Sequence, residues 1–198
     1  SIHEKLNQYC ESRVAARESG KSAVGGLFIN QLLKKRLFSS PAAFASTLEK
    51  HIETLKNGPV KKKEEIDDRI LRKAIAQAEE DYENDGDVEI AQLEAIEEAT
   101  KNSQPITKEQ EDLLEDLRQW AQSAKNRYDS KAKAIIKWLH ENLKDANGNW
   151  NNRRVILFTE YRTTHQWMHH ILASEGFGGE RLKLLHGGVD AEEREYIK

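Results

Sequence analysis

The residues best suited to bind a phosphate group follow a short apolar run in the last quarter of the chain. Residues 155–158 are continuously apolar, which is typical of a strand buried on both faces. Arg162, Thr163 and Thr164 follow at the expected start of a helix. Free backbone amides and the positive end of the helix dipole favour an anion there, and Arg162 adds a charged donor. The alternative is that Thr163 only caps its helix.

A second group of candidate residues follows a second expected strand, residues 182–185. Gly187 and Gly188 remove side chains where a ligand would need to approach the backbone closely. His186 precedes them, and Arg194 lies in the helix that comes next. The alternatives remain open: the glycines only turn the chain, Arg194 only pairs with a carboxylate, and His186 is an ordinary loop histidine.

No catalytic residue and no metal site are expected. Gly20-Lys21-Ser22 is similar to the end of a phosphate-binding P-loop, but the glycine required five positions earlier is Ala15. The preceding residues also have a helical pattern, whereas a P-loop follows a strand. The seven histidines show no zinc-type spacing with cysteine or carboxylate partners.

Most of the chain is expected to be helical, because apolar residues recur at helical spacing from Ile2 to Leu143. Capping and breaking residues mark the ends of these helices. The expected boundaries are a first helix ending near Gly20, a cap at Ser40 before Pro41, a stop at Gly58-Pro59, a break at Asp85-Gly86-Asp87 before a short helical piece, a capping box at Thr107 with Gln110, a stop at Asn147-Gly148, and a cap at Asp190 with Glu193.

The pattern changes in the final third of the chain. An expected strand at residues 155–158, a helix from Thr163 to about Glu175 and a strand at residues 182–185 have the spacing of a parallel βαβ unit. The predicted fold class is therefore mostly α with a C-terminal α/β part. A parallel sheet needs both faces covered and more strands than two, so the sequence looks like a fragment.

Charge is strongly segregated along the 198 residues. Residues 79–116 contain fifteen Asp or Glu and two Lys, a net charge of -13, although the whole chain carries only -3. The remainder is therefore net basic and suited to a phosphate backbone, which the acidic stretch would repel. The alternative is that the acidic stretch is simply a solvated helical face. A single cysteine, Cys10, excludes an intrachain disulfide framework and fits a reducing cytosol.

Four segments resemble Swi/Snf-like superfamily 2 helicases. Residues 154–164, RVILFTEYRTT, are similar to motif IV at the start of the second motor lobe, and residues 185–194, LHGGVDAEER, resemble the next motif of that lobe. Residues 129–139, DSKAKAIIKWL, resemble the helix that precedes this lobe. Residues 34–44, KKRLFSSPAAF, resemble a helical stretch between the lobes of bacterial members. The first two carry the most weight because both their order and their spacing match.

The resemblance implies an interlobe helical region at residues 1–59, an acidic helical insertion at 60–128, and the start of a truncated C-terminal RecA-like lobe at 129–198. It implies an incomplete parallel βαβ unit in that lobe. It also implies an ATP-dependent DNA helicase or translocase in which this chain, lacking the P-loop, the acidic magnesium motif and the arginine finger, is inactive alone. ATP and magnesium are expected only in the full-length protein. The implied nucleic-acid contacts are Thr159, Tyr161, Arg162, Thr163, His186, Gly187, Gly188 and Arg194.

Two functions remain as hypotheses. The first is a motor fragment with two partners, nucleic acid and the missing first motor lobe. It would bind the nucleic acid, most simply DNA, through its phosphates and without sequence preference. The second is a non-enzymatic helical module that binds another protein. No apolar run is long enough to span a bilayer, so we expect no membrane partner and a cytoplasmic location.

Overall fold

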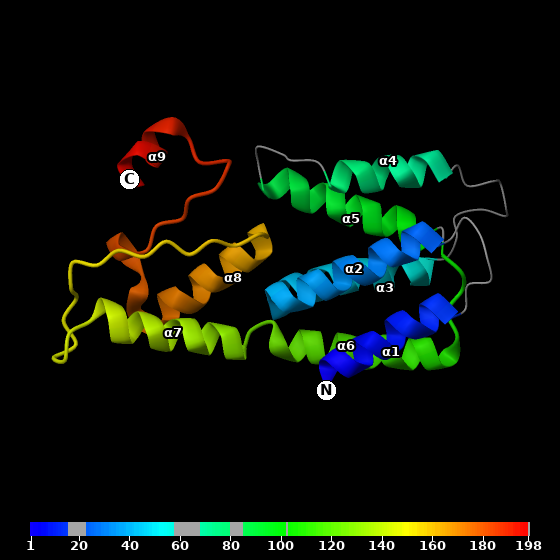
Figure 1. The fold of residues 1–198 in the computed structure, drawn as a ribbon, viewed down its shortest axis with the longest axis horizontal. Coiled ribbons are helices and arrows are strands. Elements are labelled where there is room, and N and C mark those ends of the chain that lie inside the picture. Colours follow the sequence, from blue (N-terminus) through cyan, green and yellow to red (C-terminus); the bar gives the residue numbers. More distant parts are fainter. Residues whose placement is uncertain (16–22, 58–67, 80–84, 102, 198) are drawn as a thin grey trace.

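The protein is an elongated arrangement of helices (Figure 1). The computed structural model describes residues 1–15, 23–57, 68–79, 85–101 and 103–197. Its helices are α1 (Ile2–Ala15), α2 (Ala23–Ser39), α3 (Pro41–Asn57), α4 (Asp68–Ala78), α5 (Asp85–Lys101), α6 (Lys108–Ala124), α7 (Ser130–Leu143), α8 (Arg162–Leu172) and α9 (Ala191–Ile197), with a π-helical turn, η1 (Ala173–Phe177), and a 3-10 turn, η2 (Gly179–Arg181).

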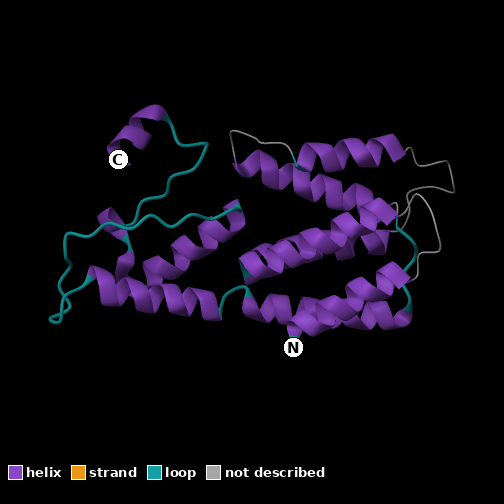
Figure 2. Cartoon of the chain, viewed as in Figure 1, coloured by secondary structure: helices purple, strands orange, loops and turns teal. Residues whose placement is uncertain are grey.

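The predicted α/β part is wrong for the residues that the structure describes. Helical conformation accounts for 76% of them, and they contain no strand or sheet. Both expected strands, residues 155–158 and 182–185, are loops (Figure 2). The only pairing of β type within the described ranges is an isolated antiparallel bridge between Lys144 and Trp150. The βαβ unit, RecA-like or otherwise, is therefore absent from the described chain.

The error has a physical reason. An apolar run predicts that a segment is extended and buried, but pairing depends on a second segment that satisfies its backbone groups. Here the run is largely exposed: Ile156 is 76% accessible and Phe158 is 90% accessible. Two short segments also bury too little surface to form a stable sheet on their own.

Several expected helix boundaries are confirmed. Ser40 accepts a hydrogen bond from the Ala43 amide at 3.1 Å, and α3 begins at Pro41. Thr107 and Gln110 form the complete capping box of α6. The Asp190 carboxylate caps α9 through the Glu193 amide at 2.8 Å.

One boundary is wrong, and others lie outside the described residues. The expected separation of two helices is present, since α4 ends at Ala78 and α5 begins at Asp85. Its expected position is wrong, because residues 85–87 form the first turn of α5, which is 17 residues long and not a short piece. A glycine costs little in a first turn, where few backbone hydrogen bonds depend on it. The positions expected to end the first and third helices, Gly20 and Gly58-Pro59, lie outside the described residues, as does the P-loop-like sequence at residues 20–22.

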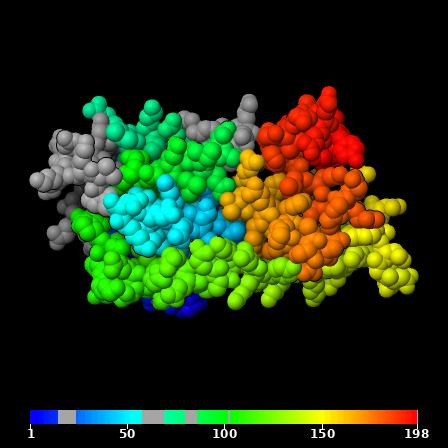
Figure 3. All heavy atoms as spheres, turned by 180° about the vertical axis from the view of Figure 1, so that it is seen from behind, coloured from blue at the N-terminus to red at the C-terminus, as the bar shows by residue number. Residues whose placement is uncertain are grey.

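Two apolar cores hold the helices together. The larger core unites α1 to α6 around fully buried side chains such as Leu33, Phe44 and Leu117, and α4 contributes the buried Leu71. The smaller core joins α7 to α8 and η1 through residues including Leu139 and Trp167. In Figure 1 the first six helices gather at one end of the molecule, and α6 and α7 follow one another along one edge. The view from behind shows α8, in orange, directly beside the α2–α3 region, in blue and cyan (Figure 3).

A buried hydrogen-bonded chain fixes α5 against α1 and α3. The His51 ring lies 2.7 Å from the Tyr9 hydroxyl through Nε2 and 2.7 Å from the Thr100 hydroxyl through Nδ1. The Thr100 hydroxyl donates to the Ile96 carbonyl at 2.6 Å, so it accepts from His51 Nδ1–H. Nε2 is then free to accept from Tyr9, and the ring is neutral. Burial, with a smaller effect of the Arg13 charge, lowers the pKa of His51 to about 3.

No helix within the described ranges combines the length and the apolar character needed to cross a membrane.

Candidate nucleic-acid interface

The first turn of α8 contains the central residues of the expected phosphate site. Tyr161 is the N-cap of this helix and makes no side-chain capping bond, because a tyrosine hydroxyl is too distant from the first amides. The structure supplies a carboxylate instead. Glu89 of α5 accepts the Thr163 amide at 3.1 Å and the Thr163 hydroxyl at 2.5 Å. An anion therefore does lie at this helix start, but it belongs to the protein itself.

A buried arginine completes this arrangement. Arg36 of α2 is fully buried, and its Nη1 donates to Glu89 Oε1 at 2.7 Å. This is the oxygen that also accepts the Thr163 hydroxyl. Its Nη2 donates to Gln92 at 2.9 Å, and its guanidinium carbon lies 3.9 Å from the centre of the Tyr161 ring. We call Arg36, Glu89, Gln92 and Thr163 the Glu89 cluster. Burial raises the pKa of the Tyr161 hydroxyl to about 12, so this ring stays neutral beneath the guanidinium.

The next residue, Thr164, links α8 to the junction of α2 and α3. Its buried hydroxyl lies 2.7 Å from the Ser39 hydroxyl and 2.8 Å from the Ser40 hydroxyl. The three hydroxyls form one hydrogen-bonded group, and Ser40 also caps α3. The position of the α8 start relative to α2 is therefore fixed from both sides, by this group and by the Glu89 cluster.

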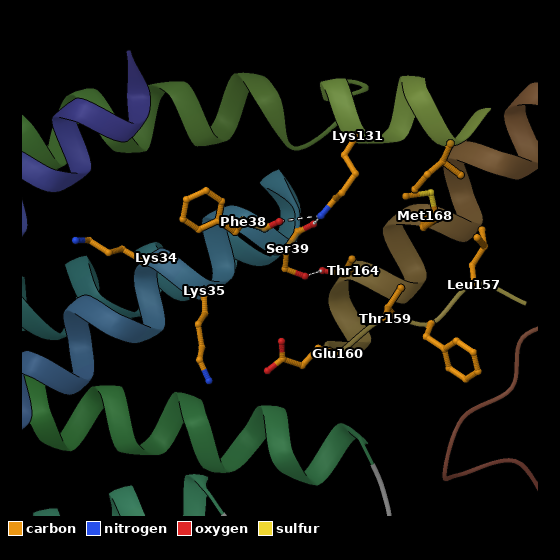
Figure 4. Close-up of a pocket in the computed structure, with 12 residues that line it drawn as sticks. Lys34, Lys35, Phe38, Ser39, Lys131, Leu157, Thr159, Glu160, Thr164 and Met168 are labelled. Carbon is orange, nitrogen blue, oxygen red and sulfur yellow. Dashed lines mark hydrogen bonds between the residues drawn. The ribbon is translucent and has the colours of Figure 1, made fainter. Parts of the chain in front are cut away.

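A groove of about 500 Å³ opens beside this junction (Figure 4). Its walls come from the end of α2, the start of α7, the loop before α8 and α8 itself. It combines three lysines with apolar side chains and one carboxylate. The lining residues are Lys34, Lys35, Phe38, Ser39, Lys131, Ile135, Leu157, Phe158, Thr159, Glu160, Thr164 and Met168. The expected site residue Thr159 is therefore part of this groove.

The basic and aromatic side chains at the groove are held in different ways. The Lys131 ammonium donates to the Phe38 carbonyl at 2.8 Å and to the Ser39 carbonyl at 2.5 Å, where the negative end of α2 favours a cation. Phe38 is 69% exposed and stacks on the His3 ring at a centroid distance of 5.2 Å. Lys35 is exposed and projects from α2, as Figure 4 shows.

The second group of expected residues forms a compact turn before α9. The His186 Nδ1 accepts the Gly188 amide at 3.1 Å, and the Arg194 guanidinium donates to the Val189 carbonyl at 3.3 Å and to the Gly187 carbonyl at 3.5 Å. Arg194 thus braces the turn. Neither glycine is among those with positive φ, which in the described part of the chain are Gly148, Gly176 and Gly179. A β-turn through these residues therefore needs no left-handed backbone at either glycine.

This turn lies near the first turn of α8. The rings of His165 and His186 meet edge to face at a centroid distance of 6.1 Å. The structure therefore brings the two groups of expected residues, around Thr163 and around His186, to neighbouring positions. Arg162 is half-buried beside them, at the first position of α8.

Sequence reasoning missed the residues that contribute most to the geometry, Arg36 and Glu89. Both lie in segments that the sequence marked, Arg36 in the stretch at residues 34–44 and Glu89 in the acidic stretch. Their pairing spans 53 positions, and neither segment contains a signal for the other. Among the described residues, no group of three or more His, Cys, Asp or Glu side chains is arranged to hold a metal ion.

Comparison of the chain with protein-family models, with curated proteins and with solved structures finds no match.

Proposed function

We propose that this chain binds a nucleic-acid strand through its phosphates, as part of an ATP-driven motor of the Swi/Snf-like type. The observation that carries the proposal is the groove beside α8, where Lys34, Lys35 and Lys131 lie with the exposed rings of Phe38 and Phe158. Proteins that bind single strands without sequence preference combine basic grooves with aromatic rings on which bases stack.

The sequence resemblances support the same proposal. The groove is bordered by parts of three segments that resemble the motor family, residues 34–44, 129–139 and 154–164. These segments are distant in sequence and meet at one surface. Phosphate contacts would come from the lysines and from Arg162, and they would carry no sequence information. ATP hydrolysis and its magnesium ion belong, in this proposal, to other parts of the motor.

The experiment is direct binding of fluorescein-labelled oligonucleotides, single-stranded and duplex, in two unrelated sequences, measured by fluorescence anisotropy. We expect equal affinity for both sequences. Lys35→Ala should weaken binding, and Phe158→Ala should weaken single-strand binding by about fivefold or more, because one base stack is worth roughly 1–3 kcal/mol. Lys73→Ala, an exposed lysine on α4 away from the groove, is the matched control. Absence of binding, or equal effects of Lys35→Ala and Lys73→Ala, would contradict the proposal.

A second candidate function rests on the exposed apolar segment at residues 156–158. Ile156 and Phe158 are 76% and 90% exposed, and this part of the loop has no β-partner in the described chain. An extended apolar segment with unpaired backbone groups is suited to pair with another polypeptide. If this candidate is correct, the chain should self-associate in sedimentation velocity experiments, and Ile156→Asp should abolish this self-association. The chain should also show no affinity for oligonucleotides. Tight oligonucleotide binding by a monomer would exclude it.

A further inference from the structure

The Glu89 cluster brings three helices together on one carboxylate. Glu89 of α5 accepts from Thr163 at the start of α8 and from Arg36 of α2, through bonds of 2.5 to 3.1 Å. These donors are a backbone amide at a helix start, a hydroxyl and a guanidinium. The same set of donors suits the oxygens of a phosphate group. The Glu89 carboxylate offers these donors a single negative charge and two oxygens.

The buried arginine shows that an anion is required at this position. Arg36 has no accessible surface, so its charge is removed from water and needs a counter-ion. Its Nε is buried without a hydrogen-bond partner. Glu89 therefore satisfies the guanidinium only in part, and a ligand with more acceptor oxygens could satisfy it further.

The position of the cluster matters for the groove. Thr163 belongs to the cluster, whereas its neighbour Thr164 lines the groove. A nucleic-acid strand that follows the groove towards the start of α8 would contact the Thr163 amide with a phosphate. Glu89 now occupies the position that this phosphate would take. The carboxylate also adds repulsion against an approaching phosphate.

We propose that Glu89 is an autoinhibitory contact: it occupies the α8 end of the nucleic-acid interface, and a phosphate must displace it. This inference rests on the proposed function and names a regulation of the same site. It also assigns the acidic stretch a role, since α5 is part of it.

The fold permits this displacement without unfolding α5. The C-terminal half of α5 is anchored by the buried residues Ala95, Ile96 and Ala99. In its N-terminal half, residues 86–93 are half-buried or exposed, and Ile90 beside Glu89 is 57% exposed. Displacement of Glu89 would therefore require rotation of its side chain, or a small movement of the first two turns of α5.

The test compares Glu89→Gln with Glu94→Gln, which removes the same charge from an exposed position of the same helix. Binding of a fluorescein-labelled single strand should tighten by about three- to tenfold in Glu89→Gln, because a charged competitor for the donors is lost. The dependence of log K on log salt should steepen by about 0.7 for one added phosphate contact. Glu94→Gln should change neither quantity beyond the small effect of a screened charge. Equal effects of the two variants would overturn the inference.

A second readout separates this inference from the proposed function. Inorganic phosphate is titrated into the protein while the Thr163 amide is followed by NMR, with Thr163→Ala used to assign the resonance. We expect the resonance to move in Glu89→Gln at phosphate concentrations that leave the wild type unchanged. If no variant binds oligonucleotides, the proposed function fails, and this titration still decides whether Glu89 blocks a phosphate site at Thr163. An unmoved Thr163 resonance in Glu89→Gln would overturn it.

A converse variant covers the case in which Glu89→Gln does not fold. Gln92 already accepts from Arg36 at 2.9 Å, so Gln92→Glu adds a second carboxylate to the cluster without removing a partner. Oligonucleotide binding should weaken by about threefold, more than in Gln77→Glu on the exposed face of α4. Equal weakening in both variants would attribute the effect to net charge alone and contradict the inference.

Discussion

Glu89 accepts two hydrogen bonds from Thr163, one from the backbone amide at 3.1 Å and one from the hydroxyl at 2.5 Å. The two residues are 74 positions apart, in α5 and at the start of α8. Since Arg36 binds the same carboxylate, three distant segments depend on one side chain. The acidic stretch and the expected phosphate site are therefore parts of one structure, and several consequences can be measured.

Removal of the Glu89 carboxylate should destabilise the fold. Glu89→Ala leaves the Arg36 charge buried without its counter-ion, which should lower the free energy of unfolding by about 3 kcal/mol. Urea denaturation followed by circular dichroism measures this difference. Glu94→Ala, on an exposed face of α5, should stay within about 0.5 kcal/mol of the wild type. A loss for Glu89→Ala no larger than for Glu94→Ala would show that the ion pair is not needed.

Stability should fall at acid pH because of His51. Burial lowers the pKa of His51 to about 3, while the unfolded chain takes up this proton near its ordinary pKa of 6.5. The unfolded state therefore binds more protons between these values. The contribution of neutral His51 is complete above about pH 6.5 and is lost as the pH falls, by on the order of 1 kcal/mol per pH unit.

Urea denaturation over a pH series measures this effect. In His51→Gln an amide can replace both hydrogen bonds of the ring. Between pH 6 and pH 4 the unfolding free energy of this variant should therefore depend less on pH than that of the wild type, by on the order of 1 kcal/mol per pH unit. His170→Gln changes an exposed histidine and should leave the profile unaltered. Parallel profiles for the wild type and His51→Gln would mean that His51 is not a buried neutral residue.

The end of the α8 region depends on a left-handed glycine. Gly176 has φ of 83°, a conformation that side chains disfavour, and it interrupts the helical backbone inside η1, one residue before Phe177. Gly176→Ala should therefore lower the unfolding free energy by about 1 kcal/mol. Gly178, with φ of -75°, is the control, since a methyl group there meets Ala173 only at ordinary contact distances of 3.5 Å or more. Thermal denaturation in which the Gly178→Ala loss equals the Gly176→Ala loss would contradict this account.

The sequence predicted local features well because their causes are local. The capping box at Thr107 and Gln110, and the cap at Ser40, depend on residues three positions apart and are confirmed. The apolar run at residues 155–158 predicted a buried strand, which is wrong because pairing and burial depend on other parts of the chain. Helical periodicity alone could not show that α5 already begins at Asp85 and includes residues 85–87.

The candidate site was only partly predictable for the same reason. The sequence marked Thr163 as a helix start suited to an anion, and an anion does lie there. It could not reveal that the anion is Glu89, because the total charge of the acidic stretch does not show which carboxylate turns inward. Nor could it reveal that Arg36, one of three consecutive basic residues, is the one that is buried while Lys35 is exposed.

The central claim is that the chain holds the phosphates of a nucleic-acid strand, and the salt dependence of oligonucleotide binding tests it most directly. For a single strand, log K should fall linearly with log salt, with a slope of about -0.7 for each phosphate contact. Arg162→Ala should weaken binding and reduce the steepness by about 0.7, while Lys101→Ala, whose ammonium pairs with Glu97 and Glu98, should change neither. Affinity that does not depend on salt, or a slope unchanged by Arg162→Ala, would contradict the account.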